Sequence, residues 1–109
     1  MARTTSKRRL KQAGFETTTV QDFLDLSDEE AAYIEMKLAL ARALKRYRTN
    51  ELKMSQHRLA ELIGSSQSRV AKMEAGDPSV TLDLLVRSML STGLNRADIA
   101  RALNRKRPA

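Results

Sequence analysis

The residues best suited to chemistry in this sequence are three consecutive polar side chains, Gln67, Ser68 and Arg69, directly before the apolar Val70. A glutamine amide can make two hydrogen bonds to adenine, an arginine can make two to guanine, and a serine hydroxyl can bond either base. At an exposed helix start, these three side chains would read base edges in a major groove. Arg69 could equally contact a phosphate. Each of the three could also be an ordinary solvated polar residue without a ligand.

Four further residues near this triplet suit phosphate groups: Lys72, Arg58, Ser55 and Ser66. Lys72 follows one helical turn after Ser68, where a phosphate is easier to reach than a base edge. The two serines have a second explanation, because each precedes an apolar-periodic segment and can cap a helix without any ligand. Phosphate contacts would orient the protein on a duplex but would carry no direct sequence information.

Two short helices joined at one glycine would bring these side chains together. Gly64 accepts φ > 0 without a Cβ penalty and marks the turn, while Gly76 and Pro78 end the second helix. The predicted helix-turn-helix spans residues 55–74, and its second helix, 66–74, would enter the major groove. The caps and inner faces behind this prediction are Ser55 with Leu59, Leu62 and Ile63 in the first helix, and Ser65 or Ser66 with Val70 and Met73 in the second.

The stretch SQHRLAELIGSSQSRVAKMEAG, residues 55–76, resembles the helix-turn-helix of the Xre/Cro/C1 repressor family, which includes the lambdoid phage repressors. In that family the segment typically reads TQ-x-x-LA-x-x-x-G-x-[ST]-Q-x-x-[IV]-S-x-[LWM]-E-x-G. Ala60, Gly64 and Glu74 fall on its fixed positions, whereas Ser65 departs from it, since the family often has an apolar residue there. The resemblance implies that Gln56 hydrogen-bonds a phosphate at the start of the first helix.

The similarity extends over residues 24–100 to the small HigA-like antitoxins and their solitary relatives. It implies a five-helix, lambda-repressor-like fold, binding of double-stranded DNA by a homodimer at a palindromic operator, and repression. A RelE/HigB-type toxin partner is implied only for the HigA-like branch, because relatives without a toxin share the domain. The lead interpretation is an autoregulating antitoxin of a type II toxin-antitoxin pair. The alternatives are a stand-alone Xre-family regulator and a protein-interaction module that has lost DNA binding.

The remaining elements are also predicted as helices, so the expected fold class is all-α with five helices. Ser27 and Glu30 form a capping box that starts a helix running to about Tyr47, and the segment RTNELKM, residues 48–54, is the expected break. The apolar patch at 20–26 fits a helical turn or a strand-like segment equally well. The fourth and fifth helices are predicted from Thr81 to Thr92 and from Asn95. Their expected apolar faces, with that of the first helix, are Tyr33, Ile34, Leu38, Leu40, Ala41, Leu44 and Tyr47, then Leu82, Leu85, Val86, Met89 and Leu90.

The formal net charge of +7 favours an anionic partner such as nucleic acid. The predicted organisation is a flexible basic arm at 1–20, a helix-turn-helix DNA-binding domain at 21–103 and a basic tail at 104–109. The acidic run at 16–35 would suit a basic toxin or this chain's own bases. Four bases of the arm would enter a minor groove or follow phosphates, or would form only a solvated tail: Arg3, Lys7, Arg8 and Arg9.

Several classes of protein are disfavoured by what the sequence lacks. There is no cysteine, which excludes disulfides and thiolate metal sites. His57 is the single histidine, and no neighbouring pattern gives it the role of a general base or a metal ligand, so no enzyme activity, metal or cofactor is predicted. No apolar run reaches the roughly 18 residues of a membrane span, and the expected location is cytoplasmic, without a membrane partner. Dimerisation is expected through residues 82–103 or, as a second choice, through the N-terminal segment.

Overall fold

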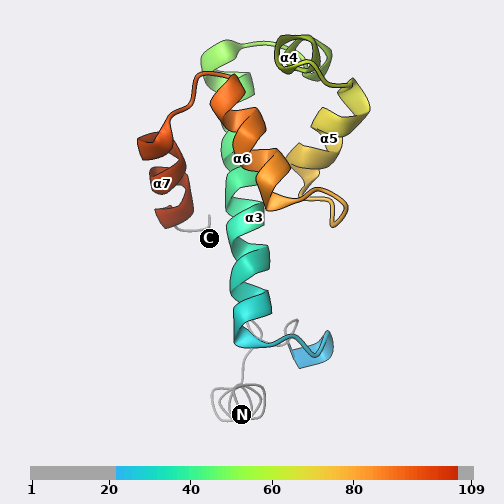
Figure 1. Cartoon of the computed structure of the whole chain (residues 1–109), viewed down its shortest axis with the longest axis vertical. Helices are drawn as coiled ribbons and strands as arrows, with labels where there is room; N and C mark the ends of the chain where they lie inside the picture. Colours follow the sequence, from blue (N-terminus) through green and yellow to red (C-terminus); the bar gives the residue numbers. More distant parts are fainter. Residues whose placement is uncertain (1–21, 106–109) are drawn as a thin grey trace. The chain divides into compact units, whose positions relative to one another are not determined.

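The computed structural model describes residues 22–105, and residues 28–105 form five α-helices and one π-helix (Figure 1). The elements are α3 Asp28–Arg46, η2 Tyr47–Leu52, α4 Gln56–Ile63, α5 Gln67–Ala75, α6 Leu82–Ser91 and α7 Arg96–Asn104. The part of the chain that the structure describes has no strand. The prediction of an all-α fold with five helices is therefore confirmed. The predicted arm at 1–20, with Arg3, Lys7, Arg8 and Arg9, and the tail residues 106–109 lie outside the described residues.

The described residues fall into two units, one ending at Glu35 and the other beginning at Met36, so the boundary lies inside α3. In the first unit, the predicted capping box is present. The Glu30 backbone N–H donates to Ser27 Oγ at 3.1 Å, and the Ser27 N–H donates to Glu30 Oε1 at 2.9 Å. The apolar patch before it is helical at residues 22–23 and turns at 24–25, so its described part follows the helical alternative.

The break predicted at 48–54 is wrong in its first part, because the helical path continues as the π-helix η2 through Leu52. The Thr49 hydroxyl donates to the carbonyls of Lys45 at 2.9 Å and Arg46 at 3.3 Å. Such a back-bonded hydroxyl competes with the regular backbone ladder, and π-type turns are one way in which a helix accommodates the change. The helical path ends at Lys53, which has a left-handed φ of +51°.

The core of the second unit is built from apolar side chains of α3 to α7 and of the loop after α5. Leu59, Val70 and Met73 are 0% exposed, which confirms the inner face predicted for the second short helix and Leu59 of the first. Burying a side chain of this size contributes about 1.5–3 kcal/mol to folding. The core members are Leu40, Ala41, Ala43, Leu44, Leu59, Ala60, Val70, Met73, Val80, Leu85, Met89 and Ala102.

Four predicted inner-face residues are instead exposed: Leu62, Leu90, Tyr33 and Ile34. On α4, the buried pair is Leu59 and Ala60, with Ile63 partly buried. One face of a helix holds residues spaced three and four apart. Leu62 is three residues after Leu59 but only two after Ala60. It therefore lies at the edge of the buried stripe and remains 53% exposed. The apolar pattern alone therefore predicted a wider buried stripe on these helices than the structure has.

Candidate nucleic-acid interface

The turn between α4 and α5 is built around Gly64, whose φ is +68°. The Gly64 N–H donates to the Glu61 carbonyl at 3.3 Å, and the Ser65 N–H donates to the Ala60 carbonyl at 2.8 Å. This pair of bonds is the Schellman motif that commonly ends a helix. A Cβ at this position would meet nothing within 4 Å, so glycine is needed for the left-handed backbone and not for space. The turn predicted at Gly64 is confirmed.

The N-terminus of α5 is fixed by Ser66, whose Oγ accepts a hydrogen bond from the Arg69 backbone N–H at 3.1 Å. Ser66, and not Ser65, is therefore the cap. Gln67 opens the helix, and Gln67, Ser68 and Arg69 are all exposed. The structure thus brings the three predicted base-reading side chains together on the first turn of one helix. The free backbone N–H groups and the dipole there favour a negatively charged neighbour.

The face of α5 that is turned away from the core carries two residues that the sequence analysis did not single out, Ala71 and Ala75. Val70 and Met73 fix the buried side of the helix. The 3.6-residue period places Ser68, Ala71 and Ala75 on the opposite side, and Lys72 beside them. Ala75 and Lys72 are exposed and Ala71 is half-buried. The short alanine side chains let the helix approach a groove closely, and an alanine methyl can contact a thymine methyl.

The two helices of the motif are held at their outer ends by a buried carboxylate, Glu74. Arg48 of η2 donates to it twice, from Nε to Oε2 at 2.6 Å and from Nη2 to Oε1 at 2.9 Å. Gln56 of α4 donates its Nε2 to Glu74 Oε1 at 3.1 Å. Arg48 Nη1 also donates to the Met54 carbonyl at 2.8 Å. The start of α4, the end of α5 and η2 are therefore tied to one another through a single carboxylate.

This network is nearly shielded from solvent, since the side chains of Arg48 and Glu74 are 10% and 3% exposed. The hydrogen bond to Glu74 raises the pKa of Arg48, and this effect outweighs the burial that would lower it. Glu74, which falls on a fixed position of the family pattern, thus forms a buried salt bridge. The partner Arg48 was missed, because the sequence offers no signal that separates it from the other bases near the end of α3.

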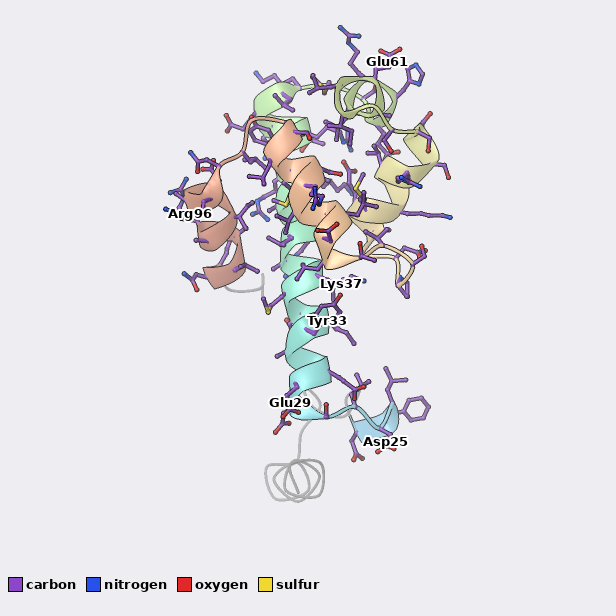
Figure 2. The ribbon with its side chains drawn as sticks, in the orientation of Figure 1. Asp25, Glu29, Tyr33, Lys37, Glu61 and Arg96 are labelled. Carbon is purple, nitrogen blue, oxygen red and sulfur yellow. The ribbon has the colours of Figure 1, made fainter. Side chains whose placement is uncertain are left out.

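Of the residues predicted to contact phosphates, Ser55, Gln56, Arg58 and Ser66 lie at the starts of α4 and α5, whereas Lys72 lies in the last turn of α5. Ser55 caps α4 by accepting the Arg58 backbone N–H at 3.1 Å. Arg58 Nη1 donates to Glu61 Oε1 at 2.9 Å, and Figure 2 shows Glu61 on the outer side of α4. His57 lies 3.4 Å from the same carboxylate and is exposed, as expected for a surface histidine. All of these pairs stay on the surface of α4 and do not hold the motif together.

Ser65 departs from the family pattern, in which this position often carries an apolar residue, and the departure has a structural consequence. Its Oγ is buried and has no hydrogen-bond partner, the single such side-chain atom found among residues 22–105. Position C″ of a Schellman motif frequently carries an apolar contact. The serine therefore places a hydroxyl where an apolar group would fit.

Two further properties bear on the kinds of site that the chain could hold. Across residues 22–105, no helix combines the length and the apolar character that crossing a bilayer requires. The same stretch contains no group of three or more His, Asp or Glu side chains arranged to hold a metal ion.

The comparison with protein-family models finds that residues 44–87 match the family described as Helix-turn-helix. The comparisons with curated proteins and with solved structures return no match to this chain. The matched segment runs from Leu44 in α3 to Arg87 in α6, and it includes Arg48, Glu74, the Gly64 turn and the exposed start of α5. The segment 44–87 is therefore a helix-turn-helix domain of the Xre/Cro/C1 type, a domain found in DNA-binding transcriptional regulators.

Proposed function

We propose that this protein is a homodimeric repressor that binds a palindromic DNA operator, with Gln67, Ser68 and Arg69 reading base edges. The observation that carries the proposal is that all three side chains are exposed on the first turn of α5. Val70 and Met73 anchor the other side of the same helix in the core. A helix held in this way can enter a major groove as one rigid body and present its N-terminal side chains to the bases.

Five residues would contact phosphates on either side of the major groove: Gln56, Ser55, Ser66, Lys72 and Arg58. Ser55 and Ser66 each accept a backbone N–H, and a hydroxyl that accepts a bond still has its own proton to donate. The Gln56 amide carries two donor hydrogens, of which the bond to Glu74 takes one. Arg58 would exchange its exposed pairing with Glu61 for a phosphate, at little cost because exposed ion pairs are weak.

Dimerisation follows from the small size of one recognition helix, because a single module of this kind buries little surface and discriminates poorly. Two copies related by a two-fold axis would place their recognition helices about 34 Å apart, one turn of DNA. We propose residues 82–103 as the dimer contact, supported by the exposed apolar side chains of Leu90 and Leu103. The N-terminal segment is the second candidate.

Within this proposal, the lead biological role is an autoregulating antitoxin of a type II pair, in the cytoplasm. Six acids in residues 22–35 would suit a basic RelE/HigB-type toxin: Asp22, Asp25, Asp28, Glu29, Glu30 and Glu35. The arm residues Arg3, Lys7, Arg8 and Arg9 would add minor-groove or phosphate contacts to the operator complex. A stand-alone regulator is the alternative, and no catalytic activity forms part of either.

The test is hydroxyl-radical footprinting of the full chain on the DNA upstream of its own gene, combined with sedimentation of the complex. We expect two protected half-sites about one helical turn apart and two chains per operator. One protected half-site with one bound chain would contradict the dimer. Co-purification with the product of an adjacent reading frame for a short basic protein would favour the antitoxin over the stand-alone regulator.

A further inference from the structure

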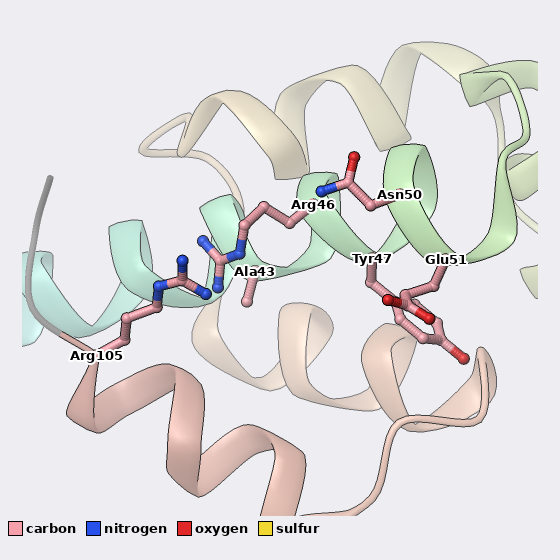
Figure 3. A pocket seen from close by; sticks show the side chains of 6 residues that line it. All are labelled: Ala43, Arg46, Tyr47, Asn50, Glu51 and Arg105. Carbon is pink, nitrogen blue, oxygen red and sulfur yellow. The ribbon is translucent and has the colours of Figure 1, made fainter.

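A second charged site lies away from α4 and α5, in an open pocket of about 320 Å³ between the end of α3, η2 and the residue that follows α7. Figure 3 shows the guanidinium groups of Arg46 and Arg105 pointing toward one another across the pocket. In the same view Tyr47 and Glu51 lie at the other end of it. The lining residues are Ala43, Arg46, Tyr47, Asn50, Glu51 and Arg105.

No carboxylate within residues 22–105 balances the charge of the two arginines. Among residues 22–105, no ion pair or side-chain hydrogen bond joins Arg46, Arg105 or the nearby Arg42 to a carboxylate. Partial burial, followed by the charges of Arg105 and Arg42, lowers the pKa of Arg46. Arg42 and Arg46 are half-buried and Arg105 is exposed, and like charges so close together repel one another unless an anion joins them.

We propose that this pocket binds a small molecule through a phosphate group held between Arg46 and Arg105. The planar fork of a guanidinium fits phosphate and carboxylate oxygens through paired hydrogen bonds. Three neighbouring positive charges favour the more highly charged phosphate over a single carboxylate. The Asn50 amide and the Glu51 carboxylate offer hydrogen-bonding groups for an uncharged polar part of the same ligand.

The pocket is of the size that small ligands occupy, which is roughly 300–1,000 Å³. None of its lining residues belongs to α4 or α5, so the proposal stands apart from operator binding. The backbone around it is already fixed, because the Tyr47 hydroxyl donates to the Thr92 carbonyl at 3.3 Å. A ligand would therefore enter a pre-formed site rather than having to order a loop.

The experiment is an NMR titration of the ¹⁵N-labelled full chain with inorganic phosphate, at constant ionic strength maintained with potassium chloride. We expect saturable shifts of the backbone amides of Tyr47, Asn50 and Arg105, and weaker binding of acetate at the same sites. Arg46→Gln and Arg105→Gln should each weaken phosphate binding at least about tenfold, because each removes a charge-assisted hydrogen bond.

Arg101→Gln is the matched control, because Arg101 lies on α7 and is paired with Asp98. It should leave phosphate affinity unchanged. Removing Arg46 relieves its repulsion with Arg42 and Arg105. The melting temperature of Arg46→Gln in chloride should therefore not fall. A loss of phosphate binding in this variant would then not result from unfolding.

Equal weakening by all three variants, or acetate binding as tightly as phosphate, would overturn the proposal. A lower salt dependence of operator binding in Arg46→Gln and Arg105→Gln would also overturn it, since the pocket would then be a contact to the DNA backbone.

Discussion

Arg48 and Glu74 form a buried bidentate ion pair, with two N···O distances of 2.6 and 2.9 Å, that connects the π-helix η2 to the end of α5. The same carboxylate accepts a bond from Gln56 at the start of α4. The relative position of the two helices of the motif therefore depends on a charge pair as well as on the apolar contacts of Leu59, Val70 and Met73.

Breaking this pair from one side should be strongly destabilising. We expect Arg48→Met to lower the free energy of unfolding by about 3–5 kcal/mol, because Glu74 would be left buried without its counter-charge. The double variant Arg48→Met with Glu74→Met should recover part of that loss. Urea unfolding followed by circular dichroism measures both.

The control is Arg87→Met, which removes an ion pair to Asp83 whose side chains are 77% and 74% exposed. It should change stability by no more than about 1 kcal/mol. Equal losses of stability for Arg48→Met and Arg87→Met would show that burial does not make the Arg48–Glu74 pair more important for folding than an exposed ion pair.

The base-reading role of α5 can be tested by shortening its exposed side chains. Gln67→Ala and Arg69→Ala should each cost roughly 1–3 kcal/mol at the cognate operator and should relax the preference for the contacted base. Both residues are exposed and neither belongs to the core, so the melting temperature should not change. Fluorescence anisotropy with a set of single-base operator variants measures the effect.

Lys72→Ala is the comparison, since Lys72 is proposed to contact a phosphate one turn further along α5. It should weaken binding to all sequences alike and reduce the salt dependence by about one unit of slope. A sequence-selective loss in Lys72→Ala, together with no loss in Gln67→Ala or Arg69→Ala, would refute the assignment of the recognition residues.

Two glycines with similar backbone angles should respond differently to alanine. Gly64 and Gly76 have φ values of +68° and +70°, so each substitution incurs the left-handed penalty of about 1–2 kcal/mol. A Cβ on Gly64 meets open space, whereas one on Gly76 would lie 2.5 Å from Leu38 Cδ2. Thermal unfolding should therefore show a larger loss for Gly76→Ala. Equal losses would mean that crowding at Gly76 is relieved without cost by movement of Leu38, and a larger loss for Gly64→Ala would contradict the prediction.

Ser65 and Ser66 are adjacent serines for which the structure predicts opposite effects. Ser65→Ala removes a buried hydroxyl that has no partner and should stabilise the protein by up to about 1 kcal/mol. Ser66→Ala removes the cap of α5 and should destabilise it by about 1 kcal/mol. Calorimetry of the two variants side by side gives the comparison, and a loss of stability in Ser65→Ala would mean that its hydroxyl does find a partner in solution.

The features that the sequence predicted well are those set by local chemistry. The capping box of Ser27 and Glu30 and the positive φ of Gly64 each depend on residues close together in the chain, and all of them are present. The exposed start of α5 also followed from local signals, because Ser66 and Val70 fix where the helix begins and which side is buried.

The features that it missed depend on contacts between distant segments. Arg48 and Glu74 are far apart in the sequence, and nothing local distinguishes Arg48 from Arg46, which lines a pocket instead. The π-helix at 47–52 arises from back-bonding by Thr49 and from the anchoring of Arg48. Leu62 was placed inside because its spacing fits a helix face, yet α4 buries a narrower stripe.

Specific binding of operator DNA by α5 is the property on which the proposed function depends. The most direct measurement compares the affinity of the full chain for the DNA upstream of its own gene with its affinity for scrambled DNA of equal length, at about 150 mM salt. We expect the affinity for the upstream DNA to be about a thousandfold or more higher than the affinity for the scrambled DNA. Equal affinities with the same steep salt dependence would contradict it, because the net charge of +7 would then be enough to explain the binding.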